Sequence, residues 1–340
     1  MSLKAPIAPM EARSVDAIPE GPDWQYEPKW DGFRCLVFRN GDKVALQSKS
    51  GKPLTRYFPE VVAVVRSLKA KTFVLDGEIV VPHGRQFSFD ELLQRIHPAK
   101  SRIERLSVET PALLIVFDLL GDPDGRSLTR LPLSERRASL EAFAKQYLET
   151  AAIRLSPATT RLSSAKGWLK KVGATLDGII AKQRSAEYAA GTRDAMVKIK
   201  NYRSADCVVG GFRYGTDTKL VGSLLLGLYD DDGLLHHVGF TSSIAKADKK
   251  ALTAKLKTLK GGPGFTGNAP GGPSRWSTER STQWVPLKPK LAVEVCYDHF
   301  SGDRFRHGTR LMRWRPDKAP KQCRLDQVKQ KKADLIKLLG

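Results

Sequence analysis

Apolar residues follow two different spacings along the first 200 positions of the chain. Short apolar runs, Leu36–Phe38 and Val44–Leu46, flank Asn40-Gly41, a pair typical of the turn in a β-hairpin. Ala112–Leu120 is apolar at nearly every position, which predicts a buried strand. Helices are expected where charged and apolar residues occupy separate faces, over Phe58–Leu68 and Leu133–Tyr147.

The pattern changes near residue 203, where expected strands follow one another with a single helix between them. The lysine-rich run at about 244–259 predicts that helix. Five or so strands with one intervening helix are typical of a small oligonucleotide-binding (OB) barrel. We therefore expect two domains, residues 1–203 with mixed α and β structure and residues 204–340 with a β-rich barrel. Strands of the second domain are expected at Ala205–Phe212, Ser223–Tyr229, Leu234–Phe240 and Leu291–Tyr297.

The charge of the chain points to a polyanionic partner. It has 57 lysines and arginines against 36 acidic residues, a formal net charge of +21. This excess favours nucleic acid first and an anionic membrane surface second. No apolar run approaches membrane-spanning length, and the N-terminus lacks the apolar core of a signal peptide. The four cysteines are scattered without a C-x-x-C pair, which argues against a zinc site or a disulfide framework and fits a reducing cytoplasm.

Lysines and carboxylates recur in four short motifs on or beside the expected strands. A free lysine amine, with a pKa of about 10.4, is protonated at neutral pH and does not attack, but nearby cations or a metal favour its neutral form. One lysine among other lysines and several acids therefore predicts a nucleophile, metal-binding carboxylates and phosphate-binding cations. The motifs are Pro28-Lys29-Trp30-Asp31-Gly32, Asp76-Gly77-Glu78, Asp177-Gly178-Ile179-Ile180-Ala181-Lys182 and Lys198-Ile199-Lys200.

In this order the motifs resemble those of the covalent nucleotidyltransferases and, within them, the ATP-dependent DNA ligases. The resemblance covers nearly the whole chain and is strongest to the short two-domain bacterial type, the LigC-like enzymes and the ligase module of LigD. It implies an α+β fold, in which an adenylation domain of antiparallel sheets with flanking helices precedes an all-β OB-fold barrel with a basic tail. It also implies sealing of 5′-phosphate/3′-hydroxyl nicks in duplex DNA during DNA repair.

The resemblance assigns the chemistry to one lysine and three acids. Lys29 is expected to attack the α-phosphorus of ATP and form lysyl-AMP, with Asp31 close to the lysine and metal. Glu78 is expected to face the ribose and the metal, Mg²⁺ or Mn²⁺. The family normally has glutamate at position 177, and this chain has Asp177, whose arm is shorter by about one C–C bond. The shorter arm favours a water-mediated contact between Asp177 and the metal.

The resemblance also defines a nucleotide pocket. Glu27 is expected to read the adenine amine, Phe117 to stack on the purine, and Arg34 to meet the ribose or a phosphate. Two positions depart from the family pattern. Lys49 stands where arginine is common and lacks its bidentate fork, and Met196 stands where a bulky aromatic residue is common.

Several cations are assigned to the phosphates of ATP. Lys198 and Lys200 alternate along an expected strand, so both side chains point to one side, where two like charges favour an anion between them. Lys182 is the third such lysine. The run Arg315-Pro316-Asp317-Lys318 resembles the last family motif, R-x-D-K, whose Arg315, Asp317 and Lys318 would orient pyrophosphate in the first step.

Two other functions remain open from the residues. An RNA ligase or capping-type nucleotidyltransferase would share the fold and differ in acceptor or nucleotide. A non-catalytic OB-fold nucleic-acid-binding protein would explain the charge but would leave Lys29, Glu78 and Asp177 without a purpose. The expected partners are nicked duplex DNA and a repair polymerase, primase or end-binding protein, with no membrane, for a monomer near the bacterial nucleoid.

Overall fold

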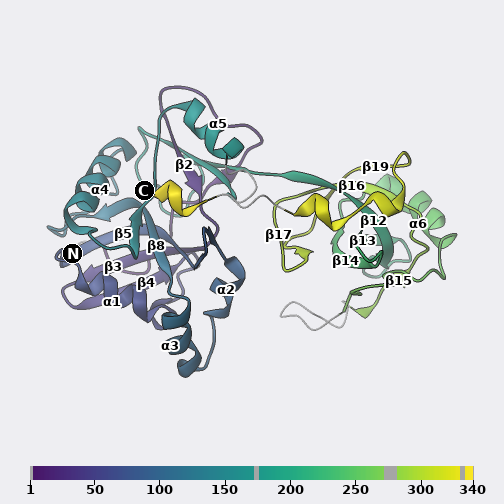
Figure 1. The fold of residues 1–340 in the computed structure, drawn as a ribbon. Helices are drawn as coiled ribbons and strands as arrows, with labels where there is room; N and C mark the ends of the chain where they lie inside the picture. The colour runs from purple at the N-terminus through teal and green to yellow at the C-terminus, as the bar shows by residue number, and fades with distance from the viewer. Residues whose placement is uncertain (1–2, 172–175, 272–281, 330–333, 340) are drawn as a thin grey trace. The chain divides into compact units, whose positions relative to one another are not determined.

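The computed structural model describes residues 3–171, 176–271, 282–329 and 334–339. It divides into two compact units (Figure 1). The first comprises Met1–Asn201 together with Lys331–Gly340, and the second comprises Tyr202–Gln330. None of the described helices has both the length and the apolar character that crossing a bilayer requires.

The C-terminal segment belongs to the first unit. Leu335 is only 5% exposed and packs in the same apolar cluster as Trp30. Its backbone N–H donates a hydrogen bond to the Arg85 carbonyl oxygen at 2.8 Å. The expected second domain extended to residue 340, so the structure differs from that expectation at its C-terminal end. The physical reason is the apolar Leu335 side chain, which is buried in the first unit.

A five-stranded sheet in the order β4-β3-β5-β8-β9 forms the centre of the first unit. Its neighbours pair antiparallel except β8 and β9, which run parallel. The predicted hairpin is confirmed, because β3 and β4 join at Gly41, whose φ of +60° suits a glycine turn. The strands are β3 (Phe33–Asn40), β4 (Lys43–Ser48), β5 (Thr72–Val80), β8 (Leu113–Gly121) and β9 (Ile153–Leu155).

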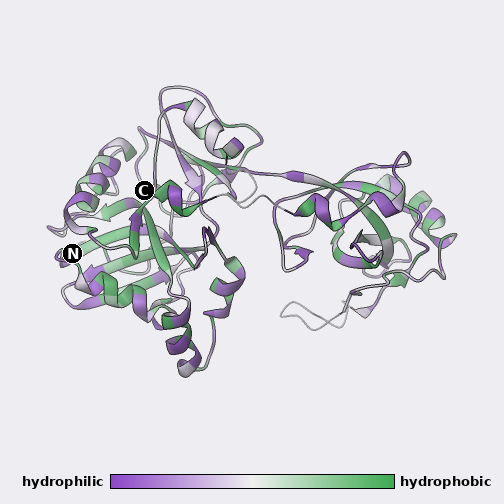
Figure 2. Cartoon of the chain, in the orientation of Figure 1, coloured by the Kyte–Doolittle hydropathy of each residue, from purple (hydrophilic) through white to green (hydrophobic). Residues whose placement is uncertain are grey.

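Helices pack on this sheet and close the first apolar core. The predicted helix over Leu133–Tyr147 is confirmed as α4 with the same bounds. The other predicted helix is α1 (Pro59–Ser67), which begins with proline at its first turn, a favoured position. In Figure 2 the central strands are largely hydrophobic, whereas α3 and α4 carry many hydrophilic residues. The remaining elements here are η1 (Thr55–Tyr57), β6 (Pro82–His83), β7 (Gln86–Phe87), α2 (Phe89–Gln94) and α3 (Lys100–Glu109).

A second, four-stranded sheet in the order β1-β11-β10-β2 completes the first unit. Its buried residues share apolar clusters with β5 and β8, so the two sheets pack against each other. Residues of both sheets therefore lie close together where the two sheets pack. The elements are β1 (Arg13–Ser14), β2 (Trp24–Lys29), α5 (Leu162–Lys171), β10 (Gly178–Gln183) and β11 (Met196–Lys200), with η5 (Ile336–Leu339) near the C-terminus.

The second unit is rich in strands, as predicted, and has the strand order β14-β13-β12-β16-β19. The two outer strands approach each other at an isolated parallel bridge between Thr241 and Thr309. The ladders among the described residues thus form a partly open barrel, which is common for an OB fold and agrees with the predicted class. The strands are β12 (Arg203–Tyr214), β13 (Val221–Tyr229), β14 (Leu235–Thr241), β15 (Val285–Pro286), β16 (Ala292–Tyr297), β17 (Phe300–Ser301), β18 (Arg304–Phe305) and β19 (Arg310–Trp314).

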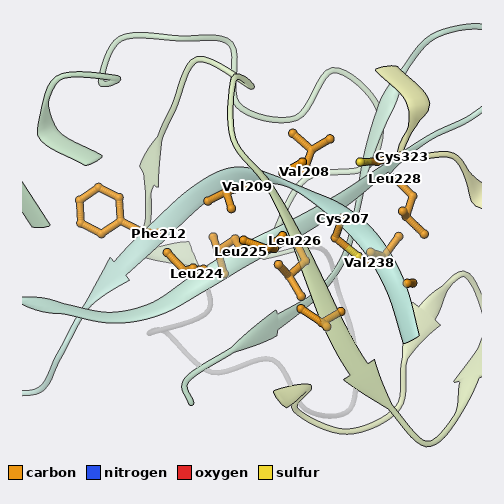
Figure 3. Packing of buried hydrophobic residues seen from close by; sticks show 14 of the residues in the cluster. Cys207, Val208, Val209, Phe212, Leu224, Leu225, Leu226, Leu228, Val238 and Cys323 are labelled. Carbon is orange, nitrogen blue, oxygen red and sulfur yellow. The ribbon is translucent and has the colours of Figure 1, made fainter. Parts of the chain in front are cut away.

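Apolar side chains from these strands fill the inside of the second unit. Figure 3 shows Val209, Leu225 and Leu226 from neighbouring strands packed together, with Cys207 and Cys323 at one end of the cluster. The predicted lysine-rich helix is present as α6 (Lys249–Lys257), shorter than the expected run and preceded by η2 (Lys246–Asp248). Two further short helices, η3 (Pro320–Gln322) and η4 (Leu325–Val328), follow the last strand.

Candidate active site

A cleft in the first unit collects predicted site residues from both sheets. They come from sequence positions as distant as Glu27 on β2 and Lys198 on β11. The N-terminal segment Pro9–Ala12 also lines the cleft and was not predicted to do so. The predicted site residues that line it are Glu27, Lys29, Arg34, Lys49, Glu78, Phe117, Lys182 and Lys198, together with Met196.

Lys29 is the last residue of β2 and forms an ion pair with Asp177. The register explains this contact, because Lys29 pairs with Gly178, the residue next to Asp177. Gly178 has a φ of +147°, and a Cβ atom there would lie 2.0 Å from the Ile199 carbonyl oxygen on β11. Only glycine fits at this position. Its close approach to β11 fixes the backbone next to Asp177, and this holds Asp177 beside the lysine.

Two residues that lie two positions apart in one strand share a face, but Asp31 and Lys29 do not, because β2 ends at Lys29. Asp31 lies in the connection to β3 instead, and its carboxylate oxygen is within 4.8 Å of one from Asp177. Gly32 permits this connection to approach β5, since a Cβ atom there would lie 2.2 Å from the Ile79 carbonyl oxygen. Two carboxylates at this separation repel each other unless a cation lies near them, and oxygen ligands suit Mg²⁺ and Mn²⁺.

Glu78 is the third acid near the lysine. Burial raises its pKa to about 7, although the charges of Arg34 and Lys29 act in the opposite direction. The charge of Asp31 adds to the rise. A carboxyl group that is costly to ionise is stabilised as an anion by a bound cation. Asp31 and Asp177 therefore offer a pair of carboxylates that fits a divalent metal, and Glu78, which lines the same cleft as Lys29, is a further carboxylate available to it.

Glu27 and Lys182 form a buried ion pair at 2.8 Å, with side chains 2% and 3% exposed. Gln25 donates a second hydrogen bond to the Glu27 carboxylate, also at 2.8 Å. The Lys182 ammonium lies 4.5 Å from the centre of the Phe117 ring. Lys182 was predicted as a phosphate cation, but in this structure it pairs with the residue predicted to read adenine.

Arg34 contacts the Phe117 ring as well, with its guanidinium carbon 4.6 Å from the ring centre. It also donates to both oxygens of the buried Asp76, at 2.5 and 2.6 Å. Burial lowers the pKa of Arg34, but the charge and hydrogen bonds of Asp76, with the charges of Tyr188 and Glu78, together outweigh it and the net pKa is raised. Tyr188 donates a further hydrogen bond to Asp76 at 2.6 Å. Phe117 thus lies between cations, and Asp76 fixes one of them.

Lys198 and Lys200 are half-buried on β11 and alternate with the buried Val197 and Ile199, as the sequence predicted. Burial lowers the pKa of Lys198, and the charges of Lys29, Lys49, Lys200 and Arg193 lower it further. Lys198 lines the cleft, whereas Lys200 does not belong to its lining. The cleft therefore has a cluster of positive charge at one side, which favours a polyanion.

Sequence reasoning missed several residues at this site. Glu11 accepts from Lys49 at 3.0 Å and from Arg193 at 2.9 Å, and the Lys49 hydrogen bond is the main cause of a lowered Glu11 pKa. Glu11 lies in a proline-rich stretch with no periodicity, so no local signal identifies it. Asp76 belonged to a recognised motif but was assigned no role, and Tyr188 had no signal in its surroundings.

In the second unit, Arg315, Asp317 and Lys318 form a cluster of ion pairs. Arg315 binds Asp317 through Nε at 3.0 Å and Nη2 at 2.8 Å. Its Nη1 donates to Asp206 at 2.7 Å, and the Lys318 ammonium donates to the other Asp206 oxygen at 2.8 Å. Asp206 was not predicted as a site residue. One carboxylate on β12 thus holds Arg315 and Lys318, and Arg315 in turn holds Asp317.

Two family models match the chain. One is described as the ATP dependent DNA ligase domain and matches residues 9–200, and the other as the ATP dependent DNA ligase C terminal region and matches residues 217–318. DNA ligase C2 of Mycolicibacterium smegmatis is 43% identical over 95% of this chain and 94% of its own length. DNA ligase C of Mycobacterium tuberculosis is 42% identical over 96% of this chain and 95% of its own length.

A solved structure of a Lig E DNA ligase has a TM-score of 0.55 with this chain. It is 13% identical and covers 91% of this chain and 99% of its own. That likeness concerns the fold alone. With the family matches, it confirms the predicted class, a ligase nucleotidyltransferase domain followed by an OB-fold domain.

Proposed function

Because the chain belongs to the family of ATP-dependent DNA ligases, we propose that it seals 5′-phosphate/3′-hydroxyl nicks in duplex DNA through an adenylylated Lys29. The observation that carries this proposal is the position of Lys29 at the end of β2, in a cleft that is lined by acids and by further lysines and in ion-pair contact with Asp177. Nucleophilic catalysis by lysine requires that arrangement.

Three transfers complete the proposed reaction. The Lys29 amine attacks the α-phosphorus of ATP, a phosphorus–nitrogen bond forms and pyrophosphate leaves. The 5′-phosphate of the nick then attacks the lysyl-AMP, which restores the lysine and gives an adenylylated DNA end. The 3′-hydroxyl finally attacks that end and releases AMP as the phosphodiester bond forms. Each transfer depends mainly on alignment and charge stabilisation.

We propose that Asp177 orients the Lys29 amine towards the α-phosphorus, since it is the carboxylate in contact with it. Asp31, Glu78 and Asp177 would hold Mg²⁺ or Mn²⁺. A metal there neutralises the charge that develops on the phosphate oxygens. The elevated pKa of Glu78 supports this assignment, because a cation offsets the cost of its ionised form.

The rest of the cleft is proposed to bind the nucleotide. Glu27 would accept from the adenine amine and Phe117 would stack on the purine, which requires one of the cations on that ring to move. Arg34 would meet the ribose or a phosphate. The phosphates would contact the cations Lys49, Lys182, Lys198 and Lys200, with Arg315, Asp317 and Lys318 acting on pyrophosphate in the first step.

The same proposal extends to the cellular role. The net charge of +21 supports binding to nicked duplex DNA, and we propose that the protein acts at the bacterial nucleoid in the cytoplasm. Relatives named DNA ligase C support ligation of DNA, and we propose that it serves DNA repair, including end joining with a companion polymerase, primase or end-binding protein. We propose that the protein acts as a monomer.

An intact-mass measurement tests the proposal most directly. The protein is mixed with ATP and Mg²⁺, and a single adenylyl adduct is expected on the peptide that contains Lys29. Lys29→Ala is expected to abolish both the adduct and the sealing of nicked DNA. Lys69→Ala, at a lysine on the surface of the same unit, is the matched control and is expected to seal normally. An adduct on another residue contradicts the mechanism, and sealing of nicked RNA but not DNA would favour an RNA ligase.

A further inference from the structure

Asp206 connects two cations that the proposed function needs. It lies on β12, directly opposite Glu294 of β16, and its side chain is 11% exposed. One carboxylate oxygen accepts from Arg315 at 2.7 Å and the other accepts from Lys318 at 2.8 Å. A single buried carboxylate thus sets the positions of a guanidinium and an ammonium group that lie three residues apart in sequence.

The backbone of Asp206 is fixed as well. The side-chain amide of Gln327 accepts from the Asp206 N–H at 3.0 Å and donates to the Asp206 carbonyl oxygen at 3.2 Å. The next residue, Cys207, is fully buried in the apolar core of the barrel. The hydrogen bonds to Gln327 and the packing of Cys207 in the core therefore fix the backbone at Asp206. Its carboxylate extends from a backbone position that does not move easily.

Arg315 has a second carboxylate partner, and the two partners differ in exposure. Asp317 is 62% exposed, against 11% for Asp206. An exposed ion pair is screened by water and exchanges at little cost, whereas removal of one partner from a buried pair is strongly unfavourable. Arg315 donates to Asp317 through Nε and Nη2. These are thus the donors for which an external anion can replace Asp317. The Nη1 edge stays with Asp206.

The other charges around the cluster support this division. Glu294 lies 4.0 Å from the Arg315 guanidinium and is paired with Arg313 at 2.7 Å. It therefore does not replace Asp206 as the main partner of Arg315. Together these contacts hold the guanidinium plane in one orientation with a defined outward edge, the geometry that bidentate recognition of a phosphate uses.

We propose that Asp206 is a positioning residue for the first step of ligation. It holds Arg315 and Lys318 so that their outward donors meet the pyrophosphate portion of ATP, while Asp317 occupies that edge of Arg315 until the phosphate replaces it. This inference rests on the proposed function of Arg315 and Lys318. It makes Asp206 necessary for transfer of AMP to Lys29 and unnecessary for joining a DNA end that already carries AMP.

The test separates these two steps in the full-length protein. The protein is first treated with pyrophosphate to discharge bound AMP and is then desalted. Covalent labelling by ATP with Mg²⁺ measures the first step, and closure of a nick that carries AMP on its 5′-phosphate measures the last. Asp206→Asn preserves the shape of the side chain and removes its charge. It is expected to slow labelling by at least about tenfold and to change closure of the adenylylated nick by less than about twofold.

Two variants establish that Asp206 acts through Arg315. Arg315→Ala is expected to slow labelling. In that background Asp206→Asn is expected to slow labelling by a smaller factor than it does in the parent, because only the Lys318 contact remains to be lost. Asp231→Asn is the control for charge, because Asp231 is a 79% exposed carboxylate that pairs with Arg324 in the same unit. It is expected to label at the parent rate. If Asp206→Asn is recovered unfolded, Asp206→Glu, which retains the charge and displaces it, is expected to show the same loss in the first step.

Several outcomes overturn the inference. Labelling of Asp206→Asn at the parent rate removes the positioning role. Equal losses in labelling and in closure, with a lowered melting temperature, assign Asp206 to fold stability alone. Normal labelling of Arg315→Ala contradicts the proposed function of Arg315 itself, and this result is distinguishable because Asp206 is not altered in that variant.

Discussion

The carboxylate of Asp177 contacts the amine of Lys29, although 148 positions separate the two residues along the chain. Antiparallel pairing of β2 with β10 creates this contact, because it places Gly178 opposite Lys29. The usual glutamate of the family has a longer arm than aspartate. In this chain the shorter residue reaches the lysine directly, which assigns it a role in addition to the predicted one with the metal.

Replacement of Asp177 tests that role. Asp177→Asn is expected to slow adenylylation of Lys29 by about a hundredfold, since it removes the charge that orients the amine and helps to hold the metal. Asp177→Glu, which restores the usual family residue, is expected to retain more activity. Single-turnover labelling with ATP measures both. Asp194→Asn alters an exposed acid before β11 and is the matched control. Equal rates for Asp177→Asn and Asp194→Asn would contradict the assignment.

Glu78 predicts a pH dependence of stability. Its pKa is about 7 in the folded protein, above the ordinary value of 4.5, so the folded state binds the proton more tightly than the unfolded state. Stability is therefore expected to fall as the pH rises from about 4.5 to 7, and the full cost applies above 7. Glu78→Gln removes this cost and is expected to stabilise the protein at about pH 8, by an amount on the order of 3 kcal/mol.

The comparison is made by thermal or urea unfolding without divalent metal. At about pH 4 the variant and the parent are expected to have similar stability, because Glu78 is protonated in both states. Adenylylation by Glu78→Gln is expected to be severely reduced, so the variant is more stable and less active. A variant that is destabilised equally at both pH values would show that burial does not raise this pKa.

Gly178 is expected to tolerate no side chain. Gly178→Ala places a Cβ atom 2.0 Å from the Ile199 carbonyl oxygen at a φ of +147°. The strand start must shift to relieve this overlap, and Asp177 moves with it. We expect a loss of several kcal/mol in unfolding free energy or, in protein that folds, loss of adenylylation. Gly167→Ala is the control, since Gly167 lies in α5 with open space around it and alanine favours helix. Normal adenylylation by Gly178→Ala would contradict the role of this backbone position.

The C-terminal segment is expected to stabilise the first unit. Leu335→Ala should lower the free energy of unfolding by about 2–5 kcal/mol, because it leaves a cavity beside the cluster that contains Trp30. Ile336→Ala, at a neighbouring residue that is 37% exposed, should have little effect. Urea unfolding followed by tryptophan fluorescence measures the difference. A fragment that ends at residue 203 lacks Leu335 and should be less stable than the same unit within the full chain. Similar stabilities of Leu335→Ala and Ile336→Ala would contradict this packing role.

Much of the architecture could be predicted from local patterns. The hairpin at Asn40-Gly41 and the helix over Leu133–Tyr147 depend on residues close in sequence, so their signals are local. The OB-type unit followed from successive strands with one helix. Its partly open closure at Thr241 and Thr309 could not be predicted, because closure depends on strands far apart in the chain.

The sequence by itself determined the family, the types of residue in the cleft and the order in which they occur. Only the tertiary structure decided their pairing. Glu27 binds Lys182, Asp177 binds Lys29, and Asp206 holds Arg315 and Lys318. The motifs show which charged side chains the chain contains. Strand register and burial determine which opposite charge lies within hydrogen-bond distance, and a buried charge requires such a partner.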